Sequence, residues 1–100
     1  MLATMKKKDA KEPIFVAVTS EDIDRGQPDD AYRDPVARAI KRATGSRWVE
    51  VYPDTLVVWL GEKCYGCKTP DSVKKFLKAL DDGREVKPFG FSVTLKPRQD

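Results

Sequence analysis

The amino-acid sequence predicts an α+β domain of the ferredoxin-like class, a split βαβ (βαββαβ) fold with two helices on one face of a four-stranded antiparallel sheet. Two observations lead to this prediction. Four short runs rich in β-branched and aromatic residues have the character of strands, and two other runs repeat apolar residues at helical spacing. Their order along the chain is that of the split βαβ arrangement. With 100 residues, the chain is long enough for one such domain.

The first half of the chain supplies one strand and one helix. Residues 14–18 are apolar on both faces, which favours a central strand. Residues 19–34 form a long polar connection with room for one helical turn. A helix is then expected to begin after Asp34, which can cap it, with Pro35 in its first position. Gly45 is expected to end that helix in a left-handed conformation.

The second half supplies a hairpin, a helix and a last strand. Residues 48–52 and 55–60 are predicted to pair as a hairpin, and residues 61–68 to form a loop. A helix capped by Thr69 follows, and the alternation in residues 89–95 is typical of an edge strand. In the ferredoxin-like order the first and third strands lie parallel in the middle of the sheet.

The two ends of the chain are predicted to be tails around a single domain. Residues 1–12 contain four lysines against two acidic residues, so most of the net charge of +3 falls in this basic tail. We expect residues 1–12 to be flexible, residues 13–97 to form the domain and residues 98–100 to be a C-terminal tail. Apolar runs are shorter than the ~20 residues of a membrane span. Because no apolar stretch follows the lysines as in a secretory signal, we expect a cytoplasmic protein with no membrane partner.

Large aromatic residues fall on the strand face that the helices would leave uncovered. Period-two alternation sends Phe15, Trp48, Tyr52 and Trp59 to that face together. An exposed apolar patch of this kind usually marks an interaction site, and we predict that it binds a protein partner or a second copy of the chain. The alternative is that residues 19–34, the tail or lateral packing cover these side chains.

Nucleic-acid binding is a second hypothesis. The first strand resembles the short ribonucleoprotein motif of RNA-recognition domains, in which an aromatic residue at the position of Phe15 stacks on a base. The third strand lacks the basic residues of the partner motif, and Glu50 opposes a positive groove. Arg38, Lys41 and Arg42 on the first predicted helix are candidates for phosphate contacts, although charged outer helix faces are common.

The third hypothesis is a thiol or metal site. Cys64 and Cys67 form a CxxC pair between a strand and a helix, where thioredoxin-like proteins hold a dithiol. The chain contains no histidine, so the pair would supply half of a shared zinc site. An unreactive pair of loop cysteines is the alternative. The chain also lacks a P-loop, a dinucleotide turn and a Ser/His pair, so we predict a protein that is not an enzyme and holds no cofactor.

Two stretches of the sequence resemble small uncharacterised proteins encoded by bacteriophages and some actinobacteria. They follow the pattern VTxEDIxxG over residues 18–26 and PVAxAIxRATG over residues 35–45, with further likeness over residues 82–91. The resemblance implies a phage or prophage origin and no established activity. A phage origin would make this a viral protein of the host cytoplasm, for which a host-modulating or anti-defence role is a reasonable expectation. Those relatives often carry a cysteine where this chain has Asp34, so a metal or redox role does not carry over from them.

Overall fold

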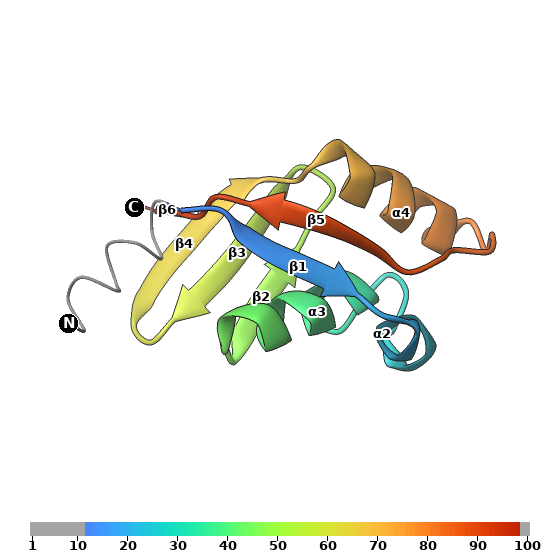
Figure 1. Ribbon diagram of the computed structural model, residues 1–100, viewed down its shortest axis with the longest axis horizontal. Coiled ribbons are helices and arrows are strands. Elements are labelled where there is room, and N and C mark those ends of the chain that lie inside the picture. Colours follow the sequence, from blue (N-terminus) through green and yellow to red (C-terminus); the bar gives the residue numbers. More distant parts are fainter. Residues whose placement is uncertain (1–11, 99–100) are drawn as a thin grey trace.

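The computed structural model describes residues 12–98, which form an α+β fold with two antiparallel sheets (Figure 1). The expected α+β class is therefore confirmed. The small sheet pairs β1 (Ile14–Val18) with β5 (Phe89–Val93). The large sheet has the order β2, β3, β4, β6, with bounds Trp48–Val51, Thr55–Leu60, Lys63–Lys68 and Lys96–Pro97. The strand pairing thus differs from the single four-stranded sheet expected of the ferredoxin-like arrangement.

The main difference is the third strand of the large sheet, because residues 63–68 of the expected loop form the strand β4. Gly61, with φ +66°, allows a tight turn after β3, and Leu60 and Lys63 then pair across it. This local hairpin occupies the edge of β3 on which a parallel β1 was expected. A short hairpin closes at much lower entropic cost than a long-range parallel pairing. β1 instead pairs with β5 and exposes one face, so the prediction of a central strand was wrong.

Three helices connect the strands in the described part of the chain. α2 (Ser20–Arg25) begins with a capping box between Thr19 and Asp22. α3 (Pro35–Thr44) begins as expected, because the Asp34 carboxylate accepts a hydrogen bond from the Ala37 N–H at 2.7 Å. The expected stop at Gly45 is confirmed by its left-handed φ of 77°.

The start of α4 (Asp71–Asp81) differs from the expected cap. Its N-cap is Pro70, which offers no side-chain hydrogen bond. The Thr69 hydroxyl instead donates to the Tyr52 carbonyl at 2.7 Å, and it ties the start of the helix to the end of β2. The Thr69 side chain therefore links α4 to the β2 segment and does not cap α4.

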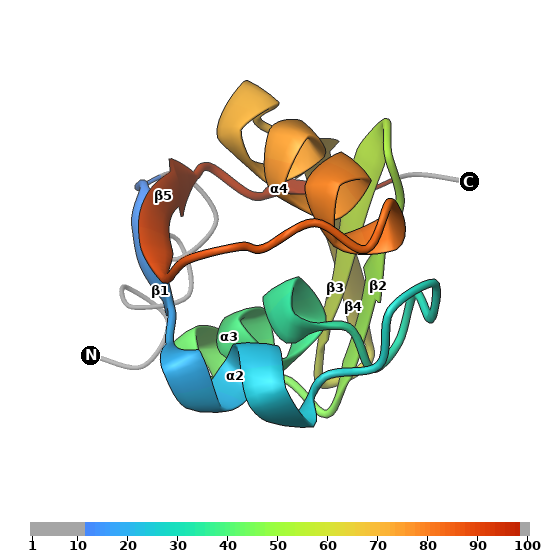
Figure 2. The ribbon, with the colours of Figure 1, turned by 90° about the vertical axis from the view of Figure 1, so that its right-hand side faces the viewer.

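The core lies between the two sheets, with α3 closing one side of the space and α4 the other (Figure 2). Its fully buried side chains come from both sheets and from α3 and α4: Val16, Val18, Val36, Ile40, Val49, Leu56, Val58 and Val73. The last expected strand ends early, at Val93. Leu95 is then buried in the core as the chain crosses from β5 in the small sheet to β6 in the large one.

The two predicted tails fall almost wholly outside the described residues. Only Glu12 of the N-terminal tail and Arg98 of the C-terminal tail are described, and the Arg98 N–H donates to the Cys64 carbonyl at 2.9 Å. This bond continues the pairing of β4 with β6 one residue beyond the end of β6. Among residues 12–98, no helix has the length and apolarity to cross a membrane.

Candidate functional site: the outer face of the large sheet

The large sheet has one face in the core and one face directed away from it. The alternation is fixed by Val49, Val51, Leu56 and Val58, which all face the core. The residues between them lie on the outer face: Trp48, Glu50 and Tyr52 from the β2 segment, Thr55, Val57 and Trp59 from β3, Cys64, Gly66 and Lys68 from β4, and Lys96 with Arg98 at the β6 edge. α3 and α4 lie on the inner side, as Figure 2 shows.

Four aromatic side chains, Tyr32, Trp48, Tyr52 and Trp59, form what we call the aromatic face. Their exposed fractions are 40%, 49%, 37% and 37%. Trp48 and Trp59 are direct cross-strand partners, and the ring of Tyr32 lies 4.9 Å from that of Trp48 at an interplanar angle of 44°. The 4.9 Å spacing of Tyr32 and Trp48 is typical of an interacting aromatic pair. Strand register places Trp59 beside Trp48, and Tyr52 shares the acceptor Glu50 with Trp48, so the four side chains form one cluster.

Glu50 holds two of these rings in place. One carboxylate oxygen accepts the indole N–H of Trp48 at 2.7 Å, and the other accepts the hydroxyl of Tyr52 at 2.7 Å. Hydrogen bonding to Glu50, and then to Tyr32, raises the pKa of Tyr52 above its usual range. The Glu50 charge is thus used within the cluster, and a ligand meets rings that are already oriented.

Ser46 fixes the backbone beneath the two tryptophans. Its buried hydroxyl lies between the carbonyl groups of Trp48 and Trp59 and also accepts the Trp48 N–H at 3.1 Å. This side chain joins the start of β2 to the end of β3. The position of the tryptophan pair is therefore set by the backbone and by a buried polar group.

The structure does not bring Phe15 to the aromatic face. Phe15 is 66% exposed on the outer side of the small sheet, which points away from the large one (Figure 2). Its ring lies over Gly90, where an added Cβ would be 2.5 Å from the Phe15 Cζ. The expectation that four aromatics share one sheet face was wrong for Phe15, because β1 does not pair with β3.

Tyr32 is the member of the cluster that the sequence did not indicate. It belongs to the polar connection, and the Ala31 carbonyl accepts the Val51 N–H at 2.8 Å, which brings the connection to the edge of β2. The connection does not bury the aromatic residues, as the alternative to an exposed interaction face would require. It adds a ring to the cluster and leaves Trp48 about half exposed.

The middle of the outer face is covered by its own side chains. Val57 is only 5% exposed although it does not belong to the core cluster between the sheets. Arg98 lies across Gly66, where an added Cβ would be 2.9 Å from the Arg98 Cδ. Lys96 pairs with Gly66 at the same edge. The outer face therefore carries rings and a carboxylate toward β2 and two cationic groups toward β6.

The two cysteines are not brought together. They lie three residues apart on β4, so one faces outward and the other faces the core. Three residues of strand span roughly 10 Å, beyond the ~7 Å between Cα atoms that a disulfide allows. Both thiols are free, and burial raises the pKa of Cys67. No group of three potential metal ligands occurs among residues 12–98.

The three candidate phosphate contacts have separate roles around α3. Asp22 is fully buried and accepts hydrogen bonds from Arg42 at 2.6 and 2.9 Å and from the Arg38 Nε at 3.4 Å. Burial would raise the pKa of Asp22, but the hydrogen bonds from Arg42 and Thr19 outweigh it and lower the pKa to about 2. Arg42 is thus a structural residue. Lys41 donates to the Tyr32 carbonyl, a neutral acceptor, at 3.1 Å.

Comparisons of the chain with protein-family models, with curated proteins and with solved structures found no significant match. The resemblance to phage proteins therefore stays a prediction, and the function has to be argued from the geometry of the outer face.

Proposed function

We propose that the protein is a small non-enzymatic interaction module that binds a second copy of itself through the aromatic face. The observation that carries the proposal is the ordered and exposed cluster of Tyr32, Trp48, Tyr52 and Trp59. Tryptophan and tyrosine dominate the binding energy of protein interfaces. Rings already held by Glu50 lose little conformational entropy on binding.

The distribution of charge favours a second copy as the occupant. Glu50 lies toward one edge of the outer face, and Lys96 and Arg98 lie at the other. A two-fold axis parallel to the strands would stack β2 of one copy over β6 of the other, and the interface would be isologous. Glu50 would then face Lys96 of the second copy, and Trp48 would face Arg98 of the second copy in a cation–π arrangement.

Two other occupants would fit the exposed rings, but the charges of this face do not favour them. A host-modulating or anti-defence role would require a different protein as the partner. The rings could bind such a protein equally well, but its surface charge is unknown, so charge complementarity with this face does not support it. A single-stranded nucleic acid could stack on Trp48 and Trp59, yet the carboxylate of Glu50 beside the rings opposes a phosphate backbone. Only the second copy is matched by charges that this face itself carries.

The first test is the mass of the protein in solution. We expect a concentration-dependent dimer in analytical ultracentrifugation at about 100 µM, and we expect Trp59→Ser to be monomeric at the same concentration. Circular dichroism and thermal unfolding would establish that the variant is folded. A wild-type chain that stays monomeric at about 1 mM would overturn the proposal and leave the face to another partner.

The second test exchanges charges across the proposed interface. Glu50→Lys and Lys96→Glu each place like charges opposite one another in a homodimer, so each variant alone should dimerise at least tenfold more weakly, corresponding to about 1.4 kcal/mol. An equimolar mixture of the two variants makes both contacts attractive again, and we expect a heterodimer. Glu50→Gln keeps an acceptor for Trp48 and Tyr52 and separates the loss of charge from the loss of ring order. If the mixture remains monomeric while both the wild type and Glu50→Gln dimerise, the two copies do not meet in this orientation.

A further inference from the structure

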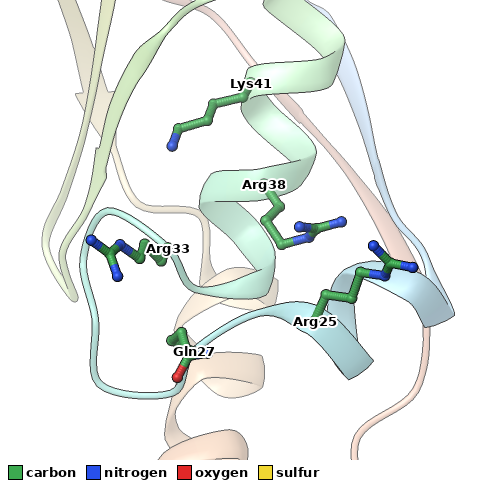
Figure 3. Close-up of a pocket in the computed structure, with 5 residues that line it drawn as sticks. All are labelled: Arg25, Gln27, Arg33, Arg38 and Lys41. Carbon is green, nitrogen blue, oxygen red and sulfur yellow. The ribbon is translucent and has the colours of Figure 1, made fainter.

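A second feature lies on the other side of α3 from the core. It is an open hollow of about 400 Å³, lined by four cationic side chains and one amide, with no acidic residue among residues 12–98 in its lining. Figure 3 shows Arg38 and Lys41 extending from α3, Arg25 from the end of α2, and Gln27 and Arg33 from the connecting segment. The volume lies within the roughly 300–1,000 Å³ of small-molecule sites.

The backbone around the hollow is held by close contacts. An added Cβ at Gly26 would lie 2.5 Å from the Pro35 nitrogen, so the end of α2 approaches the start of α3 as only glycine allows. The Gln27 N–H donates to the Arg33 carbonyl at 2.9 Å and closes the connection into a loop. The Asp30 carboxylate accepts the Arg33 N–H at 3.1 Å. The cationic side chains therefore project from fixed backbone positions.

The positive charge of the hollow is only partly neutralised. Arg38 shares the single carboxylate of Asp22 with Arg42, which leaves one positive charge over. Lys41 has no ion pair among residues 12–98, because its ammonium group meets a carbonyl. The unmatched charge of the Arg38–Arg42–Asp22 group and the charge of Lys41 together leave two excess positive charges beside the hollow.

The remaining two arginines hold their partners loosely. Arg25 pairs with Glu21 at 3.3 Å and Arg33 with Asp30 at 3.9 Å, and both arginine side chains are more than two thirds exposed. Exposed pairs of this kind contribute little stability, so an anion can compete for these guanidinium groups at small cost.

We propose that this hollow binds a phosphate group, with the positive charge supplied by the cationic side chains that line it: Arg25, Arg33, Arg38 and Lys41. A phosphate monoester carries close to two negative charges at neutral pH, which matches the uncompensated charge. The planar fork of arginine suits phosphate oxygens, and charge-assisted hydrogen bonds of this type are the strong ones. The volume exceeds that of a phosphate alone, so the rest of the ligand has room beside Gln27.

The test uses sodium pyrophosphate as the probe, with sodium chloride at matched ionic strength as its control. Titration of ¹⁵N-labelled full-length protein should give saturable shifts of the Arg25, Gln27 and Arg33 amide signals. Lys41→Met and Arg33→Gln should each weaken binding about tenfold, whereas Lys75→Met, an exposed change on α4, should not. Thermal unfolding of each variant checks that it is folded.

Two results would overturn the proposal. One is the absence of saturable shifts with pyrophosphate beyond those produced by chloride. The other is a loss of pyrophosphate affinity in Lys75→Met equal to that in Lys41→Met, which would mean that the affinity depends only on the net charge of the protein. A short single-stranded oligonucleotide then identifies the source of the phosphate. If the oligonucleotide binds and pyrophosphate displaces it, the natural phosphate belongs to a nucleic-acid backbone. If the oligonucleotide does not bind but pyrophosphate does, the natural ligand is a small phosphorylated molecule. Either outcome supports a phosphate site in the hollow.

Discussion

Asp22 and Arg42 form a two-pronged ion pair, with the buried carboxylate accepting hydrogen bonds from both terminal nitrogens of the guanidinium group at 2.6 and 2.9 Å. The same arginine donates to the Ala17 carbonyl at the end of β1. Three elements, β1, α2 and α3, therefore meet at one side chain. This junction positions the helix that carries Arg38 and Lys41 on one side and core residues on the other.

Removing the Asp22 charge should destabilise the fold. Asp22→Asn leaves Arg42 without its carboxylate, and we expect a loss of about 2–4 kcal/mol in the free energy of unfolding measured by urea denaturation. Glu21→Gln is the matched control, because that carboxylate is exposed, and its effect should stay within about 0.5 kcal/mol. Equal effects of the two changes would contradict a structural role for Asp22.

The same pair predicts acid sensitivity. The pKa of Asp22 is about 2 in the folded protein and 3.8 in its ordinary state, so the folded state binds this proton more weakly than the unfolded state. The stability it contributes is complete above about pH 4 and is lost as the pH falls toward about 2. Urea denaturation of the wild type at a series of pH values should show this loss of unfolding free energy between about pH 4 and about pH 2. In Asp22→Asn, the unfolding free energy should change less with pH over the same interval.

Asp34 should produce the opposite dependence at higher pH. Burial raises the pKa of this helix cap to about 7, and Asp81 and Asp30 add to the increase, while hydrogen bonds from the Ala37 and Val36 N–H groups oppose it. The folded state holds the proton more tightly, so stability falls as the pH rises from about 4 to about 7.

Asparagine at this position keeps the cap without the charge, because it is an equally good N-cap residue. At about pH 8 we expect Asp34→Asn to be more stable than wild type by roughly 1–3 kcal/mol, and to show little pH dependence between about pH 4 and 7. Asp24→Asn, an exposed change on α2, is the control. A wild-type unfolding free energy that does not decrease over this range would show that Asp34 ionises normally.

The sequence was most informative where a structural signal is local. Asp34, Pro35 and Gly45 predicted both ends of α3, since a cap, a fixed φ and a left-handed stop act within one turn. Alternation within the β2–β3 hairpin likewise placed Trp48 and Trp59 on one face, because hairpin register depends on neighbouring residues.

Features that depend on distant segments were not predictable in this way. β4 contains Gly66, two lysines and two cysteines, so its composition is not that of a strand, and its pairing with β3 defines it. Phe15 lies on a different face from the one expected because β4, and not β1, pairs with β3, and β1 forms a separate sheet with β5. Tyr32 carried no signal at all, since its position follows from the contact between the connection and β2.

Phe15 and Trp59 should behave differently in solution, since they lie on different faces. Phe15→Ser should leave self-association unchanged, while Trp59→Ser should weaken it by more than tenfold, as expected for a central tryptophan of an interface. Sedimentation velocity of the two variants at equal concentration makes the comparison. A loss of association in Phe15→Ser would mean that the small sheet, and not the aromatic face, forms the contact.

The thiols should react independently. Cys64 lies on the outer face, whereas Cys67 packs against the core and burial raises its pKa, so Cys67 should react more slowly with a thiol reagent at neutral pH. Titration of the native protein should give two kinetic phases, and mild oxidation should yield no internal disulfide. Rapid formation of that disulfide without unfolding would contradict the strand geometry of β4.

Gly26→Ala tests whether the hollow depends on the close approach of α2 and α3. The new methyl group would lie 2.5 Å from the Pro35 nitrogen and 2.6 Å from its Cδ, and neither backbone nor ring can rotate away. The end of α2 must therefore move, at a cost of about 1–3 kcal/mol in the free energy of unfolding. Because Arg25 directly precedes this glycine, its guanidinium group moves with it, and pyrophosphate binding should weaken while self-association through the aromatic face is retained.

Gly83→Ala is the control, since nothing lies within 4 Å of an added Cβ there and only its left-handed φ is strained. If Gly26→Ala binds pyrophosphate as tightly as Gly83→Ala does, the anion does not use the arrangement of α2 against α3.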